Sequence, residues 1–352
     1  MRGRIVVALS GGVDSSVAAL LLQRDGWEVI GATLLLHPGV DAPDPALARF
    51  CAERGIELHA VPAAGEFAAR VIDPAAREYA AGRTPNPCCE CNEVLKFALL
   101  EKFARELGAD ALATGHYCVG AKGALRRGRD RAKDQSYFLY RLKRELVPFL
   151  RFPLGEMTKA EVRGIARAEN LECAEKPDSQ DVCFAVPGEC CADTLLRRAG
   201  IAPRPGRVLY RGREVGRHDG VHRVTVGQRG GLGVALGAPA YVKRIDAESG
   251  DVELCTDREL LACRSFAIAR VNWQREVPEP GSPLEVQIRY RSRPEACRVY
   301  PEGERCRIET ERPLYAVTPG QAGVIYDGDR LLGGGVIEDT LQTDHHNTGE
   351  TI

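Results

Sequence analysis

The stretch Ile5-Val-Val-Ala-Leu9, followed at once by Ser10-Gly-Gly-Val-Asp-Ser-Ser-Val17, decides the fold of this 352-residue chain. The first segment is continuously apolar and ends at a Gly-Gly pair, which predicts a buried parallel strand. Apolar residues at helical spacing between Ser15 and Gln23 predict a helix directly after it. A strand, a glycine turn and a helix in this order predict the first unit of an open α/β sheet.

The loop between this strand and helix has the composition of an anion site. Gly11 and Gly12 let the backbone approach a phosphate with no side chain in the way. The N–H groups at the start of the helix and the serine hydroxyls beside them can then hold the anion. Asp14 can hold Mg²⁺ or orient the loop. The alternative, a glycine turn with a capped helix, needs only part of this eight-residue string.

The loop lacks the Gly-Lys-Ser/Thr end of a Walker loop and resembles the pyrophosphate loop of the ATP pyrophosphatases. The resemblance implies cleavage of ATP between its α- and β-phosphates and an adenylated intermediate. It also implies that ATP and its Mg²⁺ are bound by Leu9, Ser10, Gly11, Gly12, Val13, Asp14, Ser15 and Ser16. The class includes amide and guanidino ligases as well as tRNA sulfur-transfer enzymes, so the loop alone does not select the substrate.

Segments typical of strands and of helices continue to alternate along the chain. Near residue 199 the sequence pattern changes to one typical of β-rich structure. Strands are predicted at 29–36, 56–61 and 111–114, and helices at 45–54 and 95–107. Short alternating runs separated by Gly and Pro follow and predict strands at 208–210, 221–226, 240–243, 284–290, 297–300, 305–309 and 323–326.

We therefore predict an α/β N-terminal domain with an open parallel sheet of the adenine nucleotide alpha hydrolase type, followed by two β-rich domains. The predicted boundaries are 1–198 for the ATPase and thiolation domain, 199–262 for a small β-rich domain, 263–342 for a C-terminal β-barrel and 343–352 for a flexible tail. A second break, at 277–283, is rich in proline.

Composition is typical of a soluble protein, with 44% hydrophobic and 28% charged residues. The apolar run at Ile5–Leu9 is too short for a membrane span or a secretory signal, so we expect a cytoplasmic protein with no membrane partner. Its 13 cysteines are odd in number, and in a reducing cytosol clustered ones indicate metal binding or sulfur chemistry. Scattered ones such as Cys51, Cys118 and Cys255 are predicted to be small buried hydrophobes.

The net charge of −1 gives no overall argument for nucleic-acid binding, but its distribution does. Between Lys122 and Arg151, ten residues are basic, and only Asp130, Asp134 and Glu145 are acidic. This excess predicts a phosphate footprint, with a solvated basic face as the alternative.

Three further segments carry sulfur and nucleotide chemistry. Gly82–Asn92 places cysteines at 88, 89 and 91 in a proline-stiffened loop, Ala113–Tyr117 ends a strand at a glycine, and Lys176–Phe184 brings Cys183 into a polar loop. With Lys133–Leu139 and His222–Arg229, these motifs resemble the tRNA-specific 2-thiouridylase family. The resemblance extends from about Arg4 to about Ile337, nearly the whole chain.

The resemblance implies ATP-dependent 2-thiolation of the wobble uridine of tRNA, by adenylation of the C2 oxygen and sulfur transfer. By position, Cys91 matches the nucleophile, Cys183 matches the cysteine that carries a persulfide, and Leu34 and Gly115 match the ATP pocket. The positions that match tRNA contacts are Asn86, Pro87, Cys88, His116, Lys133, Asp134, Gln135, Arg291, Ser292 and Gln321. The implied partners are the anticodon stem-loop of tRNA and a cysteine desulfurase or sulfur-relay protein.

Cys88 departs from the pattern, because part of the family has an acidic residue three positions before the nucleophile. Cys88-x-x-Cys91 with Cys183 is ligand-like spacing, and it favours a cluster of the [4Fe–4S] type with one iron open for sulfide. Zn²⁺ binding, or a spare thiol beside a persulfide site, are the alternatives.

Two other functions also remain open from the sequence. The first is another ATP pyrophosphatase, such as an amide or guanidino ligase. The second is a non-catalytic RNA-binding metal or iron–sulfur protein, against which the intact Ser10–Val17 loop argues.

Overall fold

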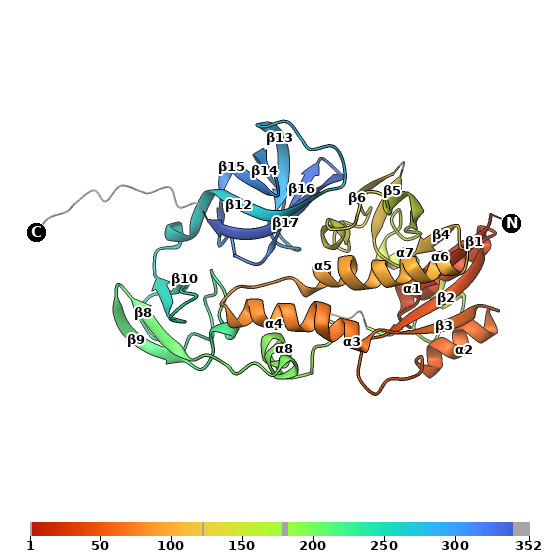
Figure 1. Ribbon diagram of the computed structural model, residues 1–352, viewed down its shortest axis with the longest axis horizontal. Coiled ribbons are helices and arrows are strands. Elements are labelled where there is room, and N and C mark those ends of the chain that lie inside the picture. The colour runs from red at the N-terminus through yellow and green to blue at the C-terminus, as the bar shows by residue number, and fades with distance from the viewer. Residues whose placement is uncertain (1, 122, 178–181, 341–352) are drawn as a thin grey trace, which may run out of the picture.

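The computed structural model describes residues 2–121, 123–177 and 182–340. Lys122, the centre of the Lys176–Phe184 motif and the tail predicted over 343–352 lie outside the described residues. Figure 1 shows an α/β unit that carries the N-terminus, a small sheet at the opposite end of the molecule and a barrel above them.

The N-terminal sheet is parallel and has the strand order β3-β2-β1-β4-β7. Its strands are β1 (Arg4–Ala8), β2 (Glu28–Leu35), β3 (Glu57–Pro62), β4 (Ala111–Ala113) and β7 (Leu150–Arg151). The apolar run that predicted a buried strand forms β1 at the centre, where Ile5, Val6 and Val7 are fully buried. The predicted open α/β sheet is therefore confirmed.

Helices cover both faces of this sheet. Val6 packs in one cluster with Leu100 of α6, whereas Ile5 packs in another with Ala19 of α1 and Leu47 of α2. Alternate residues of β1 thus bury opposite faces, as strand pleating requires. The longer helices are α1 (Val13–Arg24), α2 (Pro45–Glu53), α4 (Asp73–Ala80), α6 (Ala98–Glu106), α7 (Lys159–Ala168) and α8 (Cys191–Ala199).

Shorter helical segments lie between these elements. They are α3 (Ala64–Phe67), η1 (Ala68–Ile72), α5 (Pro87–Cys91), η2 (Asn92–Phe97), η3 (Ser136–Leu139), η4 (Val147–Phe149), η5 (Val221–Arg223) and η6 (Arg258–Leu261). Because α5, η2 and α6 are contiguous, they form one helix, and its η2 turns have π geometry.

The small sheet has the order β10-β11-β8-β9 and contains β8 (Gly206–Tyr210), β9 (Arg213–His218), β10 (Tyr241–Ile245) and β11 (Val252–Cys255). The strand predicted at 221–226 is wrong, because this segment begins with the 3₁₀ turn η5. Its His222 is buried and lies 2.6 Å from the Asp193 carboxylate of α8 through Nε2. The segment therefore docks the small sheet onto the N-terminal unit instead of extending the sheet.

Six antiparallel strands form the predicted C-terminal barrel, which pairing between β12 and β17 closes. They are β12 (Ala262–Trp273), β13 (Ser282–Gln287), β14 (Glu295–Glu302), β15 (Arg305–Tyr315), β16 (Ala322–Asp327) and β17 (Arg330–Thr340). Phe266, Ile268 and Ile308 lie in its fully buried core. The proline-rich break at 277–283 falls between β12 and the start of β13, within the barrel.

A hairpin of β5 (Cys118–Ala121) and β6 (Ala124–Arg127) joins the N-terminal unit to the barrel. β6 pairs with β17 through Arg126 and Arg330, so the barrel sheet continues into the hairpin.

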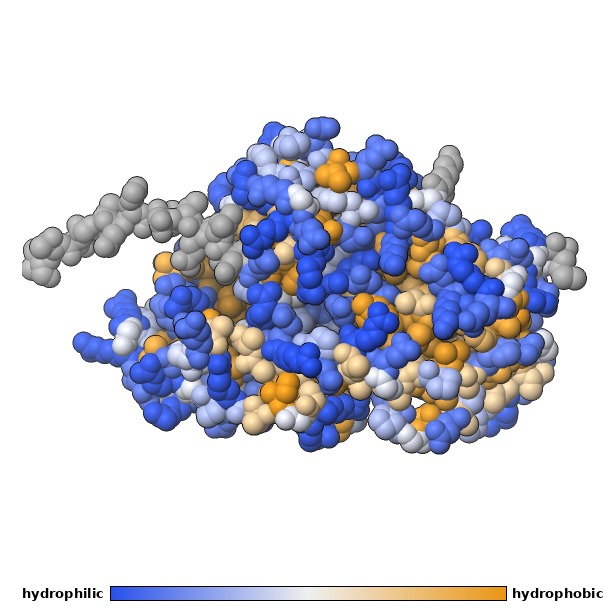
Figure 2. Space-filling model, viewed as in Figure 1, coloured by the Kyte–Doolittle hydropathy of each residue, from blue (hydrophilic) through white to orange (hydrophobic). Residues whose placement is uncertain are grey.

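The face shown in Figure 2 is largely hydrophilic, and its apolar side chains form small separate patches. No helix within the described part of the chain is both long and apolar enough to cross a membrane.

Candidate active site

The loop after β1 is held in place by its own serines. Gly11 has a φ of +73°, a left-handed conformation that favours glycine, and α1 begins after Gly12. Ser15 Oγ accepts from Ser10 N at 3.2 Å and donates to Gly12 O at 3.1 Å. Ser16 Oγ also donates to Gly12 O, at 3.1 Å. The turn is therefore fixed by internal bonds, with the start of α1 available to an anion.

A cavity of about 440 Å³ opens at the carboxyl ends of β1, β2 and β4. This is where open α/β sheets bind ligands, and the volume suits a nucleotide-sized molecule. Of the predicted ATP residues, those that line it are Leu9, Ser10, Asp14, Ser15, Leu34 and Gly115. Gly11, Gly12, Val13 and Ser16 do not line it and shape the turn behind it. His116 and Gln135, which the resemblance assigned to tRNA, line this cavity as well.

Gly115 is required by packing inside the protein. A Cβ at this position would lie 2.8 Å from the Ser15 backbone nitrogen and 2.9 Å from the Asp14 carbonyl carbon. The loop after β4 therefore presses directly on the first turn of α1. This contact fixes the phosphate loop against the neighbouring strand.

Asp14 has both carboxylate oxygens engaged. Lys159 Nζ, at the start of α7, lies 2.7 and 2.8 Å from the two oxygens, and the Tyr117 hydroxyl donates to one of them at 2.8 Å. Of the two roles suggested by the sequence, orienting the loop is the one that this geometry supports, and a role toward Mg²⁺ stays a prediction. Lys159 gave no sequence signal, since it lies far along the chain in a helix of ordinary composition.

The cysteine loop leads into α5 through an N-cap. Asn86 Oδ1 accepts from Cys88 N at 3.2 Å and from Cys89 N at 3.3 Å, and Pro87 occupies the first helical position. Cys89 is buried in the core beside Tyr137, and burial raises its pKa well above the ordinary value. Cys89 is thus a core residue, and Cys88 and Cys91 remain as the candidates for chemistry.

The barrel anchors the start of this cysteine loop. Thr84 N donates to Pro319 O at 2.9 Å, and Gln321 Nε2 donates to Thr84 O at 2.8 Å. Arg83 reaches the Ile337 carbonyl at 3.2 Å. Gln321, a predicted tRNA contact, therefore holds the loop that leads into the cysteine helix α5.

Arg141 pins the cysteine helix from the other side. Its guanidinium pairs with Glu90 at 3.1 Å and also with Glu93, and its side chain is only 11% exposed. Arg141 belongs to the basic segment between Lys122 and Arg151. Its side chain is nevertheless internal, and the two glutamates neutralise its charge.

Cys91 and the segment around Cys183 meet in one cluster. Cys91 packs with Phe184 and with Leu195 of α8, while Cys183 itself is exposed. Burial raises the pKa of Cys91 to about 11, and desolvation raises the pKa of Cys88 and of Cys183. The charges of Cys88 and Cys183 also act on Cys91. All three sulfurs are therefore close enough to influence one another.

The cysteines are not arranged as a metal site. Over residues 2–121, 123–177 and 182–340, no group of three or more His, Cys, Asp or Glu side chains is placed to hold a metal ion. The ligand-like spacing of Cys88, Cys91 and Cys183 is thus not matched by ligand geometry.

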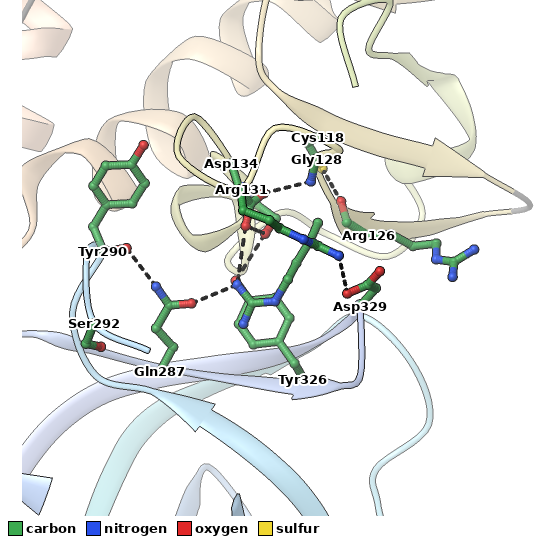
Figure 3. A network of polar contacts seen from close by, with 12 residues as sticks. Cys118, Arg126, Gly128, Arg131, Asp134, Gln287, Tyr290, Ser292, Tyr326 and Asp329 are labelled. Atoms are coloured by element: carbon green, nitrogen blue, oxygen red, sulfur yellow. Dashed lines mark hydrogen bonds and ion pairs between the residues drawn. The ribbon is translucent and has the colours of Figure 1, made fainter. Parts of the chain in front are cut away.

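Asp134, a predicted tRNA contact, is buried at the junction with the barrel. Its carboxylate accepts from Gly128 N at 2.9 Å and from the Ser136 backbone N and hydroxyl, both at 3.0 Å (Figure 3). Arg127 lies 3.3 Å from it, donates to Gln287 Oε1 at 2.9 Å and stacks 3.5 Å over the Tyr326 ring. This network joins the loop after β6 to β13 and β16 of the barrel.

The basic segment is therefore less available to phosphate than its sequence suggests. Besides Arg127 and Arg141, Arg129 pairs with Glu161 and Arg131 pairs with Asp329. The side chains that remain exposed include Arg126, Lys143 and Arg144. Among the other predicted tRNA contacts, Lys133 and Ser292 are half-buried and Arg291 is exposed.

Arg127→Met is expected to destabilise the protein by about 3 kcal/mol, because it leaves the Asp134 carboxylate buried without its cation. Urea unfolding measures this loss. The matched control is Arg126→Met on the same strand, whose exposed side chain should change the free energy of unfolding by less than about 0.5 kcal/mol. Equal stability of the two variants would contradict the structural role of Arg127.

Comparison with known proteins follows the three parts of the fold. The family described as "tRNA methyl transferase HUP domain" matches residues 3–187, its PRC-barrel domain matches 193–256, and the "Aminomethyltransferase beta-barrel domain" matches 263–337.

The chain is also similar along its length to curated bacterial proteins. It is 43% identical over 355 residues to the tRNA-specific 2-thiouridylase MnmA of Trichormus variabilis, covering 95% of this chain and 98% of that protein. It is 44% identical over 361 residues to the protein of the same name from a Synechococcus species, covering 97% and 98%. The protein of that name from Geotalea uraniireducens is 41% identical over 372 residues, covering 97% and 96%.

Proposed function

Because the chain belongs to the tRNA-specific 2-thiouridylase family, we propose that it replaces the C2 oxygen of the wobble uridine of tRNA with sulfur, using ATP. The observation that carries this proposal is the meeting of two features at one place. The cavity at the strand ends holds the phosphate loop, and Lys96 and Phe97 in its wall follow directly on the helix that carries Cys91.

Activation of the base comes first, because a carbonyl oxygen is a poor leaving group. The uridine O2 attacks the α-phosphorus of ATP, the bond to the β-phosphate bridge breaks, and pyrophosphate leaves as the base loses its N3 proton. The Ser10–Ser15 turn and the start of α1 hold the departing pyrophosphate. His116 in the cavity wall stays neutral, because burial and then Lys96 lower its pKa to about 3. It can contact the nucleotide without adding charge.

Sulfur transfer then uses the two cysteines. A terminal persulfide sulfur on Cys183 attacks C2, the C2–O bond breaks, and AMP leaves with that oxygen. Cys91 next gives up its thiol proton, which the thiolated base takes up as it is released, and the Cys91 sulfur attacks Sγ of Cys183. The S–S bond breaks, so that sulfur stays on the base and a Cys91–Cys183 disulfide forms. A dithiol reductant returns both cysteines to thiols.

Exposure of Cys183 suits the loading step, because a cysteine desulfurase or relay protein must reach this sulfur to deliver the persulfide. We derive no step through an iron–sulfur cluster, since the described cysteines do not form a ligand set.

The test is ATP cleavage that depends on tRNA. With a cysteine desulfurase, cysteine and a dithiol, the protein should release AMP only with unmodified tRNA, and thiolated tRNA should appear in equal amount on a mercury-containing gel. AMP formed without tRNA but with an amide or guanidino acceptor would indicate a ligase instead. RNA binding without AMP would indicate a non-catalytic protein.

A further inference from the structure

Lys96 lies where the two halves of the site meet. It is in the π turn η2, five residues after Cys91, and its half-buried side chain lines the nucleotide cavity together with Ser10, Asp14 and Gly115. A π turn inside an α-helix is a common feature of functional sites. Here it changes the direction of the side chains between α5 and α6.

The ammonium of Lys96 has no internal counterion in the described part of the chain. Neither a hydrogen bond nor an ion pair joins its Nζ to any residue that the structure describes. The nearby carboxylates do not serve, because Glu90 and Glu93 on the same helical segment pair with Arg141. A half-buried cation without a partner costs free energy, which an anionic ligand would recover.

The charge of Lys96 reaches each candidate sulfur. It lowers the pKa of Cys88, of Cys91 and of Cys183, opposing the desolvation that raises all three. Two sulfurs on α5, the Cys183 sulfur in the segment before α8 and the nucleotide cavity therefore share this one cation.

We propose that Lys96 is a further catalytic residue. Its ammonium contacts the α-phosphate of the adenylated uridine and the persulfide sulfur that attacks C2 of the base. This inference rests on the proposed thiolation. During attack, negative charge moves from the persulfide through C2 to the departing AMP. A fixed cation beside both ends of that path stabilises the transition state more than the resting complex.

The experiment compares Lys96→Met and Lys96→Arg with Lys102→Met, an exposed lysine on the same continuous helix. Single-turnover thiolation of tRNA should fall about 100-fold in Lys96→Met, return largely in Lys96→Arg and stay unchanged in Lys102→Met. The unfolding temperature should not fall in Lys96→Met, since no internal partner is lost. A fall in unfolding temperature that matched the activity loss would overturn the proposal in favour of a structural role.

A second readout follows the sulfur itself. The pH at which iodoacetamide alkylates Cys183 at half its maximal rate, followed by mass spectrometry, should move to higher pH in Lys96→Met and back in Lys96→Arg. Unchanged alkylation together with normal thiolation would refute the role of Lys96. Failure of the proposed function is distinct, because the unmodified protein itself would then make no thiolated tRNA.

Discussion

Asp14→Ala is expected to lower tRNA-dependent AMP formation by about 10²–10³-fold. Its carboxylate is the point where the phosphate loop, Lys159 of α7 and the Tyr117 hydroxyl are joined. Without it, Lys159 loses the partner that fixes its ammonium beside the loop, and the first turn of α1 loses its link to α7. Both effects act on the place where pyrophosphate must leave.

Affinity for tRNA should change little in this variant, because Asp14 lies in the wall of the nucleotide cavity. AMP is measured by chromatography under single-turnover conditions, and tRNA binding by filter retention. Asp25→Ala is the control, since Asp25 caps the other end of α1 and is exposed. A normal rate of AMP formation in Asp14→Ala would mean that the loop has a different role.

The N-terminal sheet could be predicted because its strands are buried on both faces. Continuous apolar runs such as Ile5–Leu9 have one interpretation when a glycine turn and an amphipathic helix follow. The segment 221–226 shows a case in which the local sequence pattern predicts the wrong structure. Its alternating pattern suggested a strand, but His222 binds Asp193 on a helix remote in sequence, and this tertiary contact overrides the local pattern.

The three clustered cysteines were predicted in a loop, and only the helix α5 seen in the structure separates them. Residues three apart share a helix face, whereas adjacent residues do not, so Cys88 and Cys91 lie together and Cys89 turns to the core. The cations that pair with the site residues could not be predicted from helical spacing. Lys159 and Arg141 come from distant segments, and nothing in their local sequence distinguishes them from ordinary surface cations.

Resemblance pointed to residues at the cavity and at the barrel junction, but not to what each side chain contacts. Asp134 is bonded to Arg127, and Gln321 is bonded to Thr84. These side chains shape the junction between the N-terminal unit and the barrel. Their roles as tRNA contacts stay predictions, and any effect of changing them on tRNA binding must be separated from loss of this junction.

Without added dithiol, Cys91→Ser and Cys183→Ser are each expected to abolish release of thiolated tRNA in a single turnover, while Cys88→Ser retains it. In the proposed persulfide route, Cys183 carries the sulfur and Cys91 releases it, so each is needed once per cycle, whereas Cys88 has no step. Release is scored with anaerobic protein and a desulfurase, without dithiol, by the amount of thiolated tRNA per protein. Cys89→Ser is unsuitable as a control, because Cys89 is buried in the core.

The Cys183→Ser and Cys91→Ser variants should stop at different steps of the reaction. Cys183→Ser should form adenylated tRNA but transfer no sulfur. Without added dithiol, Cys91→Ser should stop with tRNA linked to Cys183 through a disulfide, since no second thiol attacks Sγ. Dithiothreitol should then release this adduct as thiolated tRNA, because it supplies the missing attack. The adduct is detected on a denaturing gel.

The iron content of anaerobic protein distinguishes the persulfide mechanism from the iron–sulfur cluster mechanism. If Cys88, Cys91 and Cys183 bound a [4Fe–4S] cluster, losing any one thiolate would remove both the iron and the activity, since serine is a poor ligand for a soft centre. Under the persulfide route, anaerobic protein contains no stoichiometric iron and Cys88→Ser keeps its activity. Loss of activity in Cys88→Ser together with loss of bound iron would replace the persulfide mechanism with cluster-bound sulfide. The half-buried Cys88 would then be a ligand, and the three side chains would have to adopt an arrangement that the described structure does not show.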